Sequence, residues 1–182
     1  DIFYLDFYKN ITITITGTNG KSTTSKLLYH ILKSHKKDVR LVGNIGNPLL
    51  LEKRIKKKTI FVIEASSYQI HYSKYFRSKY SILLNISPDH LERHKTFKNY
   101  LKSKCKLIQK QKKGDYAFVD GHNALLVNEL KKNKPKSNIK FVKYYHKKNI
   151  INKIKNDYFK NLNNLKNLNF IFALSNKFKF KN

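Results

Sequence analysis

The sequence is poor in cysteine, in methionine and in acidic side chains. Cys105 is the only cysteine, so the chain has neither a disulfide framework nor a metal cluster built from cysteines, and a reducing cytoplasm fits this composition. Methionine is absent, so the chain has no initiator residue, and we interpret it as a piece of a longer protein. No run of about 18 apolar residues occurs, so no membrane span is expected, and no signal peptide is visible.

Acidic residues are far outnumbered by basic ones. The 182 residues include 11 Asp and Glu against 39 Lys and Arg, which gives a formal net charge of +28. Such a charge could indicate a nucleic-acid partner. However, Lys, Asn, Ile, Tyr and Phe are all overused together, and arginine, which makes bidentate contacts to bases, is scarce. We therefore interpret the charge as compositional drift and predict no nucleic-acid partner, although a basic surface would still attract nucleotides.

The stretch from Ile11 to Thr24 organises the chain. Isoleucines alternate with threonines up to Thr16, which is the pattern of a β-strand, and from Lys21 the apolar residues follow a helical period. Between them, Gly17 and Gly20 allow backbone angles that other residues resist. A glycine loop between a strand and a helix directs backbone N–H groups and the positive end of the helix dipole towards an anion.

The segment GTNGKST, residues 17–23, has the composition of a phosphate-binding loop. Lys21 could reach the phosphates of a nucleotide, and the hydroxyl of Ser22 could hold Mg²⁺. The strict pattern has a glycine five residues before Gly20, where this chain has Ile15. The alternative is a plain strand–turn–helix with a solvated lysine. We favour phosphate binding because the loop lies between the correct elements.

Three further apolar runs end on polar segments: Val39–Val42, Thr59–Ile63 and Tyr80–Ile86. We expect an α/β fold in one domain, with a P-loop-type, mostly parallel sheet flanked by helices. In such sheets, ligands bind beyond the carboxyl ends of the strands. Four polar segments should therefore converge on one sheet edge: Gly17–Lys21, Gly43–Gly46, Glu64–Gln69 and Asn85–His90.

The rest of the chain supplies the outer elements. We predict a helix from about Phe97 to Gln111 with Thr96 as its N-cap, and a final helix over Asn164–Phe178. In that final helix Leu165, Leu168, Phe172 and Phe178 should lie near one side. Between these helices we predict a strand at Tyr116–Val119, a turn and short helix at Gly121–Leu130, and a small β-hairpin from Ile139–Val142 and Ile150–Ile154.

Two residues after strand ends are candidate metal ligands. Glu64 could complete a Mg²⁺ site with Ser22, because hard cations prefer oxygen ligands. The alternative is a solvated glutamate at a strand end. His90, which follows Asp89, could be a ligand or a base, although a lone histidine is more often structural.

Lys104 lies on the apolar side of its helix. At about 100° per residue, Phe97, Tyr100, Leu101 and Ile108 form one stripe, and Lys104 falls in its middle. Burying an ammonium is costly. The side chain therefore either snorkels to the surface or has a lowered pKa, which makes a neutral amine available for chemistry.

Together these motifs resemble the Mur ligase family, in particular its central ATP-binding domain. The glycine spacing is the variant that this family uses, which accounts for Ile15. The resemblance implies that residues 1–10 end a preceding domain, that residues 11–182 form the central domain, and that the N-terminal UDP-binding and C-terminal domains are missing. The chain departs from the family pattern at Ala65, His71 and Asn163. The segments that carry the resemblance are TGTNGKST (Thr16–Thr23), GNIGNP (Gly43–Pro48), EASSYQI (Glu64–Ile70), NISPDHLERH (Asn85–His94) and NNLKN (Asn163–Asn167).

The resemblance also implies roles for single residues. Ser22 and Glu64 would bind one Mg²⁺, His90 would bind a second, and Lys104 would react with CO₂ to give a carbamate, an anionic oxygen ligand that suits Mg²⁺. Asn44, Ser66 and Gln69 would lie near a UDP-sugar substrate. The ATP phosphates would be held by Gly17, Thr18, Asn19, Gly20, Lys21, Ser22 and Thr23.

The implied activity is ATP-dependent amide-bond ligation in the synthesis of peptidoglycan precursors. The run Ser66-Ser67-Tyr68-Gln69 favours the branch that adds D-glutamate to UDP-N-acetylmuramoyl-L-alanine through an acyl phosphate. We expect a cytoplasmic, monomeric enzyme of this family that makes no contact with a membrane, and we expect this piece alone to be inactive. The alternatives are another Mur ligase, a folylpolyglutamate synthase-like ligase, a P-loop module without catalysis, or a basic nucleic-acid-binding module.

Overall fold

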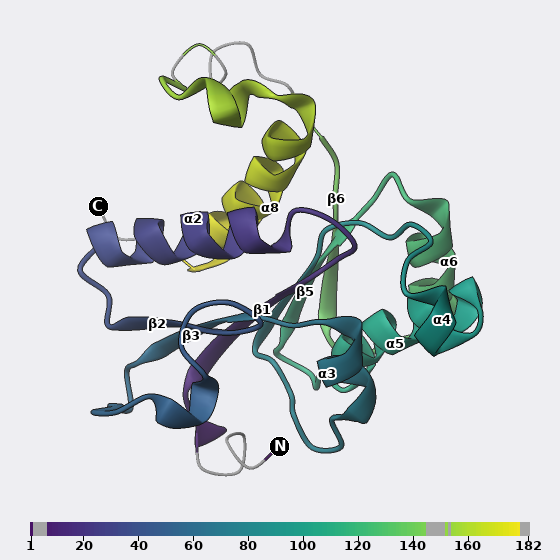
Figure 1. Cartoon of the computed structure of the whole chain (residues 1–182), viewed down its shortest axis with the longest axis horizontal. Coiled ribbons are helices and arrows are strands. Elements are labelled where there is room, and N and C mark those ends of the chain that lie inside the picture. The colour runs from purple at the N-terminus through teal and green to yellow at the C-terminus, as the bar shows by residue number, and fades with distance from the viewer. Residues whose placement is uncertain (2–6, 145–151, 153, 179–182) are drawn as a thin grey trace.

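The computed structural model describes residues 1, 7–144, 152 and 154–178. Its centre is a six-stranded sheet in the order β2-β3-β1-β4-β5-β6, in which every neighbouring pair is parallel (Figure 1). The predicted α/β fold is thus confirmed, with a wholly parallel sheet. The strands are β1 (Ile11–Thr16), β2 (Val39–Gly43), β3 (Ile60–Glu64), β4 (Tyr80–Leu83), β5 (Tyr116–Asp120) and β6 (Asn138–Val142).

Helices cover both faces of this sheet (Figure 1). The longer ones are α2 (Lys21–Ser34), α5 (Phe97–Gln109), α6 (Ala124–Asn133) and α8 (Leu162–Phe178). Shorter helical segments are α3 (Ser67–Tyr72), α4 (Leu91–His94), η1 (Leu49–Leu51) and η2 (Asp157–Lys160). No helix among the described residues is long and apolar enough to cross a membrane.

Alternation along the strands divides the core into two layers. Ile82 and Phe118 pack with α2 and α8 on one face, whereas their neighbours Leu83 and Val119 pack with α5 and α6 on the other. Successive side chains of a strand point to opposite faces. Both faces are therefore covered, and the strands read as continuous apolar runs, as is usual for parallel sheets.

The two helix boundaries most relevant to the site agree with the sequence. Thr96 caps α5 as predicted, since its hydroxyl accepts a hydrogen bond of 3.2 Å from the Asn99 N–H. α2 begins at Lys21, directly after the glycine loop (residues 17–20). Because β1 to β4 run parallel, the four predicted polar segments do converge on one edge of the sheet.

Two predictions about the C-terminal part need correction. Ile139–Val142 belongs to β6, which pairs in parallel with β5 in the main sheet, whereas most of Ile150–Ile154 lies outside the described residues. In α8 the predicted apolar side is wrong for Phe172, which is 44% exposed, while Phe170, Ile171 and Leu174 are buried and the predicted Phe178 does pack against the core. A helical period fits either side of α8, and the core contacts decide between them.

Candidate active site

The glycine loop joins the end of β1 to the first turn of α2. Gly20 has a φ of 82°, which favours glycine, and a Cβ at this position would lie 2.4 Å from Nδ2 of Asn167, so a larger residue would be strained and would displace that side chain. The Nζ of Lys21 donates hydrogen bonds to the carbonyl oxygens of Gly17, at 3.0 Å, and Thr18, at 2.8 Å. The lysine thus lies across its own loop, where the sequence predicts that phosphates bind.

Thr18 links this loop to two other segments. Its Oγ1 accepts a hydrogen bond of 3.1 Å from the Ser87 N–H and lies 3.1 Å from the hydroxyl of Tyr100. Burial raises the pKa of Tyr100 to about 12, so this hydroxyl keeps its proton at neutral pH. The glycine loop, the segment after β4 and helix α5 are therefore held together at one hydroxyl.

Glu64 is buried at the end of β3, with 1% of its surface exposed. Its Oε1 accepts a hydrogen bond of 3.1 Å from Nδ2 of Asn44, whereas its Oε2 is buried and has no hydrogen-bond partner among the described residues. The alternative of a solvated glutamate is thus wrong. A buried carboxylate oxygen without a partner is costly, and a bound cation would offset that cost, so the residues present fit a Mg²⁺ ion.

Ser22 comes from the neighbouring element, in the first turn of α2. Glu64 pairs in register with Ile15 on β1, so its strand ends beside the start of the glycine loop. The predicted pair of oxygen ligands therefore comes from the end of β3 and from the helix that follows its neighbour β1. The structure describes no group of three or more His, Cys, Asp or Glu side chains that could hold a metal by themselves.

Lys104 is buried on α5, with 2% of its surface exposed. Its Nζ donates a hydrogen bond of 2.9 Å to the carbonyl oxygen of Gly17 and lies 4.8 Å from the centre of the Tyr100 ring. Burial, with a smaller contribution from the nearby Lys21 charge, lowers the pKa of Lys104 to about 7. The amine does not snorkel to the surface, and much of it is neutral near pH 7.

His90 follows β4 in a left-handed conformation, with a φ of 52°. Its Nε2 is 3.5 Å from a carboxylate oxygen of Asp89, and its ring centre is 6.3 Å from that of Tyr100. Since Tyr100 also contacts Lys104, the predicted residues Lys104 and His90 both lie beside one buried ring.

Ser66 and Gln69 bond to each other instead of projecting freely. The hydroxyl of Ser66 accepts from the Gln69 N–H at 3.2 Å, and Oε1 of Gln69 accepts from the Ser66 N–H at 2.9 Å. This capping box begins α3. The S-x-x-Q spacing that signals a capping box is visible in the sequence from Ser66 to Gln69. A substrate role for these two residues stays a prediction.

A cavity of about 610 Å³, here called the loop cavity, opens beside the glycine loop. Sequence reasoning missed three of its residues: Asp120, His122 and Tyr144. The rings of His122 and Tyr144 stack with centres 4.7 Å apart. Asp120 ends β5, so the rule of polar residues at strand ends could have found it. Its other lining residues are Asn19, Gly20, Thr23, Leu84, Asn85, Ile86, Ser87, Asn163, Asn164, Lys166 and Asn167.

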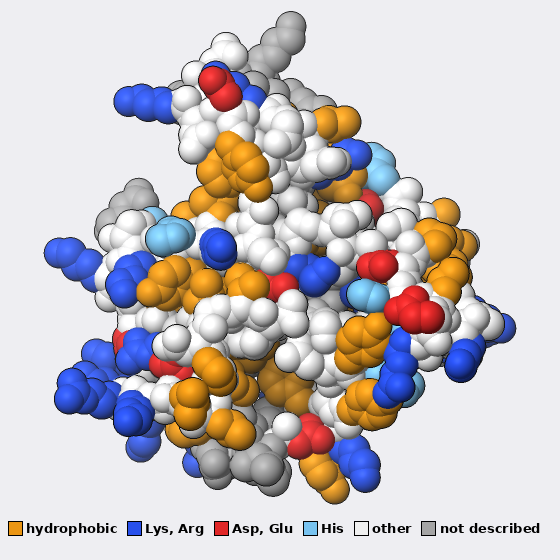
Figure 2. Space-filling view, in the orientation of Figure 1, with side chains coloured by type: hydrophobic (Ala, Val, Ile, Leu, Met, Phe, Trp, Pro, Cys, Tyr) orange, Lys and Arg blue, Asp and Glu red, His pale blue; other side chains and the backbone are white. Residues whose placement is uncertain are grey.

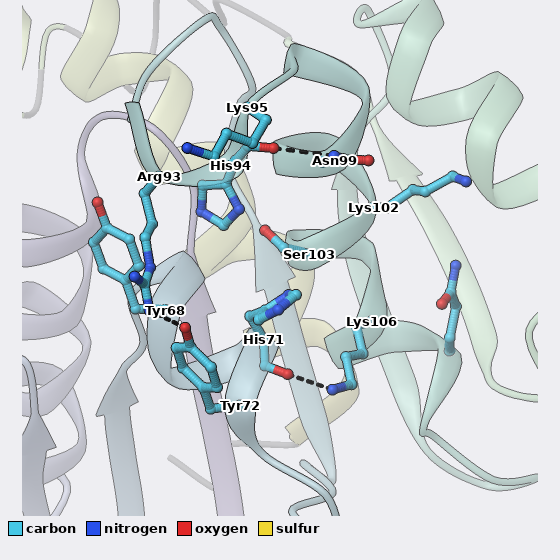
Figure 3. A pocket seen from close by; sticks show the side chains of 11 residues that line it. Tyr68, His71, Tyr72, Arg93, His94, Lys95, Asn99, Lys102, Ser103 and Lys106 are labelled. Carbon is cyan, nitrogen blue, oxygen red and sulfur yellow. Dashed lines mark hydrogen bonds between the residues drawn. The ribbon is translucent and has the colours of Figure 1, made fainter. Parts of the chain in front are cut away.

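A second cavity, here called the basic cavity, has a volume of about 780 Å³ and lies between α3, α4 and α5. In Figure 3 the Lys106 ammonium points to the carbonyl of His71, and the end of Lys102 points away from the cavity. The guanidinium of Arg93 lies 5.4 Å from the ring centre of Tyr72. Its described lining residues include no carboxylate and are Tyr68, His71, Tyr72, Arg93, His94, Lys95, Asn99, Lys102, Ser103, Lys106 and Gln109.

His94 is the most enclosed titratable group of the basic cavity. Its Nε2 lies 3.0 Å from the hydroxyl of Ser67, and its ring stacks on Tyr68 with the centres 5.6 Å apart. Burial, helped by the neighbouring histidines, lowers the pKa of His94. The imidazole therefore adds little positive charge at neutral pH, and the charge of this cavity comes from its lysines and arginine.

The glycine loop lies in a segment that this chain shares with a known protein family. Residues 15–181 match the model of the Mur ligase middle domain. The chain belongs to the Mur ligase family. Because the match includes the glycine loop, Glu64, His90 and Lys104, all predicted site residues lie within the family domain.

Curated relatives show which Mur ligases this chain resembles. The UDP-N-acetylmuramoylalanine–D-glutamate ligase of Rickettsia felis is 43% identical over 116 residues, which are 63% of this chain and 25% of that protein. The enzyme of the same name from Caldicellulosiruptor bescii is 44% identical over 116 residues, with the same coverage. The chain therefore spans about a quarter of the length of these relatives.

Solved structures support the fold. MurF ligase from Thermotoga maritima in complex with ADP has a TM-score of 0.71 and 19% identity, and the match covers 98% of this chain and 47% of that one. A UDP-N-acetylmuramoyl-L-alanyl-D-glutamate–2,6-diaminopimelate ligase has a TM-score of 0.52 and 24% identity, covering 71% and 31%. At these identities the likeness concerns the fold alone.

Proposed function

We propose that this chain is the ATP-binding domain of a ligase that adds D-glutamate to UDP-N-acetylmuramoyl-L-alanine in peptidoglycan precursor synthesis. The names of the curated relatives support this substrate pair. The observation that carries the chemistry is the buried amine of Lys104, 2.9 Å from the carbonyl oxygen of Gly17 in the glycine loop. A reactive amine is thus held directly beside the segment proposed to bind the nucleotide.

In this proposal the ATP phosphates lie against the glycine loop and the N-terminus of α2. Lys21 would turn from the loop carbonyls to the phosphates, and the backbone N–H groups would stabilise their charge. The loop cavity adjoins Gly20 and Thr23, so it is the space available for the nucleoside.

Ser22 and Glu64 would hold one Mg²⁺, and His90 would hold a second. Bound Mg²⁺ would neutralise charge on the transferred phosphoryl group. The neutral amine of Lys104 would attack CO₂, forming an N–C bond and releasing one proton, and the resulting carbamate would be an oxygen ligand. The unpartnered Oε2 of Glu64 and the lowered pKa of Lys104 support these roles.

The reaction has two steps. The carboxylate of UDP-N-acetylmuramoyl-L-alanine attacks the γ-phosphorus of ATP, and ADP leaves. The amine of D-glutamate then attacks the acyl phosphate, so that an amide forms and phosphate departs with loss of a proton. The protein's contribution is to position the groups and to stabilise charge. Asn44, Ser66 and Gln69 would lie near the UDP-sugar substrate.

Ligation would need more than this domain. We propose that residues 1–10 connect it to a UDP-binding domain and that a third domain contributes contacts to adenine and the amino acid. The complete enzyme would be a cytoplasmic monomer. The isolated 182-residue chain is expected to show no turnover.

The decisive experiment is ligation by the complete protein with ATP, UDP-N-acetylmuramoyl-L-alanine and one amino acid at a time. Release of phosphate and formation of the amide with D-glutamate, but not with L-glutamate or L-alanine, would support the proposal. Ligation of a different amino acid would indicate another branch of the family. ATP binding without any ligation would indicate a P-loop module that lacks catalysis.

A further inference from the structure

The carboxamide of Asn85 forms hydrogen bonds with both the backbone N–H and the backbone carbonyl of one residue in the glycine loop, Asn19. Its Oδ1 accepts a hydrogen bond of 2.9 Å from the Asn19 N–H, and its Nδ2 donates one of 2.9 Å to the Asn19 carbonyl oxygen. In addition, the backbone carbonyl of Asn85 accepts a bond of 3.2 Å from the Thr18 N–H. After β4 ends, Asn85 therefore continues the pairing with the chain that leaves β1.

These bonds determine the orientation of two consecutive peptide units. In a planar trans peptide, the C=O and the following N–H point in opposite directions. Because the Asn19 N–H faces Asn85, the Thr18 carbonyl faces away from it, and the Nζ of Lys21 lies 2.8 Å from that oxygen. Because the Asn19 carbonyl also faces Asn85, the Gly20 N–H is directed away from Asn85.

The neighbouring carbonyl of Gly17 is also covered. It accepts hydrogen bonds from both Lys21, at 3.0 Å, and Lys104, at 2.9 Å. The carbonyls that would repel an anion are thus paired with ammonium or amine groups or with Asn85. The direction of the Gly20 N–H is therefore already set before an anion approaches, so little ordering of this peptide is needed when the anion binds.

We propose that Asn85 is a positioning residue of the nucleotide site, whose carboxamide fixes the two peptide units between Thr18 and Gly20 so that the Gly20 N–H is directed towards the phosphates. The inference rests on the proposed function, because it takes the anion to be a nucleotide. Only a carboxamide offers a donor and an acceptor in one plane. Aspartate keeps the acceptor but places an anionic oxygen against the Asn19 carbonyl, and alanine offers neither group.

The test compares Asn85→Asp with Asn138→Asp by calorimetric titration with a non-hydrolysable ATP analogue and Mg²⁺. Asn138 also donates through Nδ2 to a backbone carbonyl, that of Asp115, but it lies at the opposite end of the parallel sheet. Both variants change the net charge equally. We expect Asn85→Asp to weaken binding about tenfold and Asn138→Asp to leave it within about twofold, because a lost bond that leaves an unpaired polar group has that size of effect.

Asn85→Ala is a second variant in case Asn85→Asp does not fold, and it should weaken binding about fivefold because water can replace part of the pairing. In the complete enzyme, Asn85→Asp should raise the KM for ATP and leave the KM for D-glutamate unchanged, whereas a general loss of structure would raise both. Nucleotide affinity within about twofold of wild type in both Asn85 variants would overturn the inference and leave the proposed function standing. The titrations use the complete protein, and absence of nucleotide binding by its wild-type form would overturn both.

Discussion

The glycine loop and the basic cavity both present several cationic side chains, but they hold them differently. In the loop, Lys21 and Lys104 share one carbonyl acceptor, that of Gly17, and Lys104 is buried. In the basic cavity, Lys106 bonds to an exposed carbonyl and Lys102 points away. On the face shown in Figure 2, Lys and Arg side chains lie at several separate places around the outline. Positive charge is thus widespread on this molecule, and fixed backbone geometry distinguishes the proposed site.

The largest effect that distinguishes the two regions is expected on the ligation rate when Lys104 is replaced. In the complete enzyme, Lys104→Ala should lower the ligation rate about 100-fold or more, because it removes a group that stabilises charge in the transition state. Short carboxylates such as formate or acetate should restore part of the rate by replacing the carbamate. The matched control is Lys102→Ala on the exposed side of the same helix, which should keep its activity. Wild-type activity in Lys104→Ala would exclude the metal-ligand role.

The second effect concerns nucleotide affinity. Lys21→Ala should weaken binding of a non-hydrolysable ATP analogue about 10- to 100-fold, since a charge-assisted bond to phosphate is lost. Lys106→Ala in the basic cavity removes the same charge and should change affinity less than about twofold. Titration calorimetry at high salt separates the two, because screening suppresses non-specific attraction. Equal losses in both variants would mean that overall charge causes the binding.

The third effect concerns the proposed ligand at the end of β3. Glu64→Gln should raise the Mg²⁺ concentration needed for half-maximal nucleotide binding about tenfold, because an anionic oxygen ligand becomes neutral. Glu52→Gln is the control, since Glu52 is a carboxylate paired with Arg40 at 3.0 Å, outside the site. An unchanged Mg²⁺ dependence in Glu64→Gln would show that the unpartnered Oε2 does not bind the ion.

The smallest effect is the pH dependence of Lys104. With a pKa of about 7, its neutral fraction should rise about threefold from pH 6.5 to 7.5 and then level off. Acetic anhydride acylates neutral amines and does not itself titrate in this range, so its rate constant for reaction with Lys104, followed by mass spectrometry, should show this curve. An ordinary exposed lysine should instead become about tenfold more reactive over the same pH unit. A tenfold rise at Lys104 would contradict the lowered pKa.

The local pattern of the sequence predicted most of the site. Alternating and continuous apolar runs located the strands. The position of Lys104 within an apolar stripe predicted either a snorkelling side chain or a lowered pKa, and its burial in the structure favours the second. A strand-end rule predicted the convergence at one sheet edge, because parallel strands end together. These inferences succeeded since each depends on periodicity or on topology that follows from periodicity.

Contacts between distant segments could not be predicted from the sequence. Ser66 and Gln69 could be singled out, but their mutual capping competes with the substrate role that the motif suggested. Similarly, nothing local indicates that the carboxamide of Asn167 would lie so close to Gly20 that a Cβ there would displace it. The buried side of α8 follows from such contacts, which is why Phe172 was placed incorrectly.

By itself, the sequence determined a parallel α/β domain, its glycine loop, and the residue types available at the strand ends, because these depend on short-range periodicity and backbone preference. The tertiary structure alone decided that Oε2 of Glu64 lacks a partner, that two lysines share the Gly17 carbonyl, and that Asn85 orients the Asn19 peptide. These features arise where segments 20 to 87 residues apart meet, and their geometry is set by how the strands and helices pack.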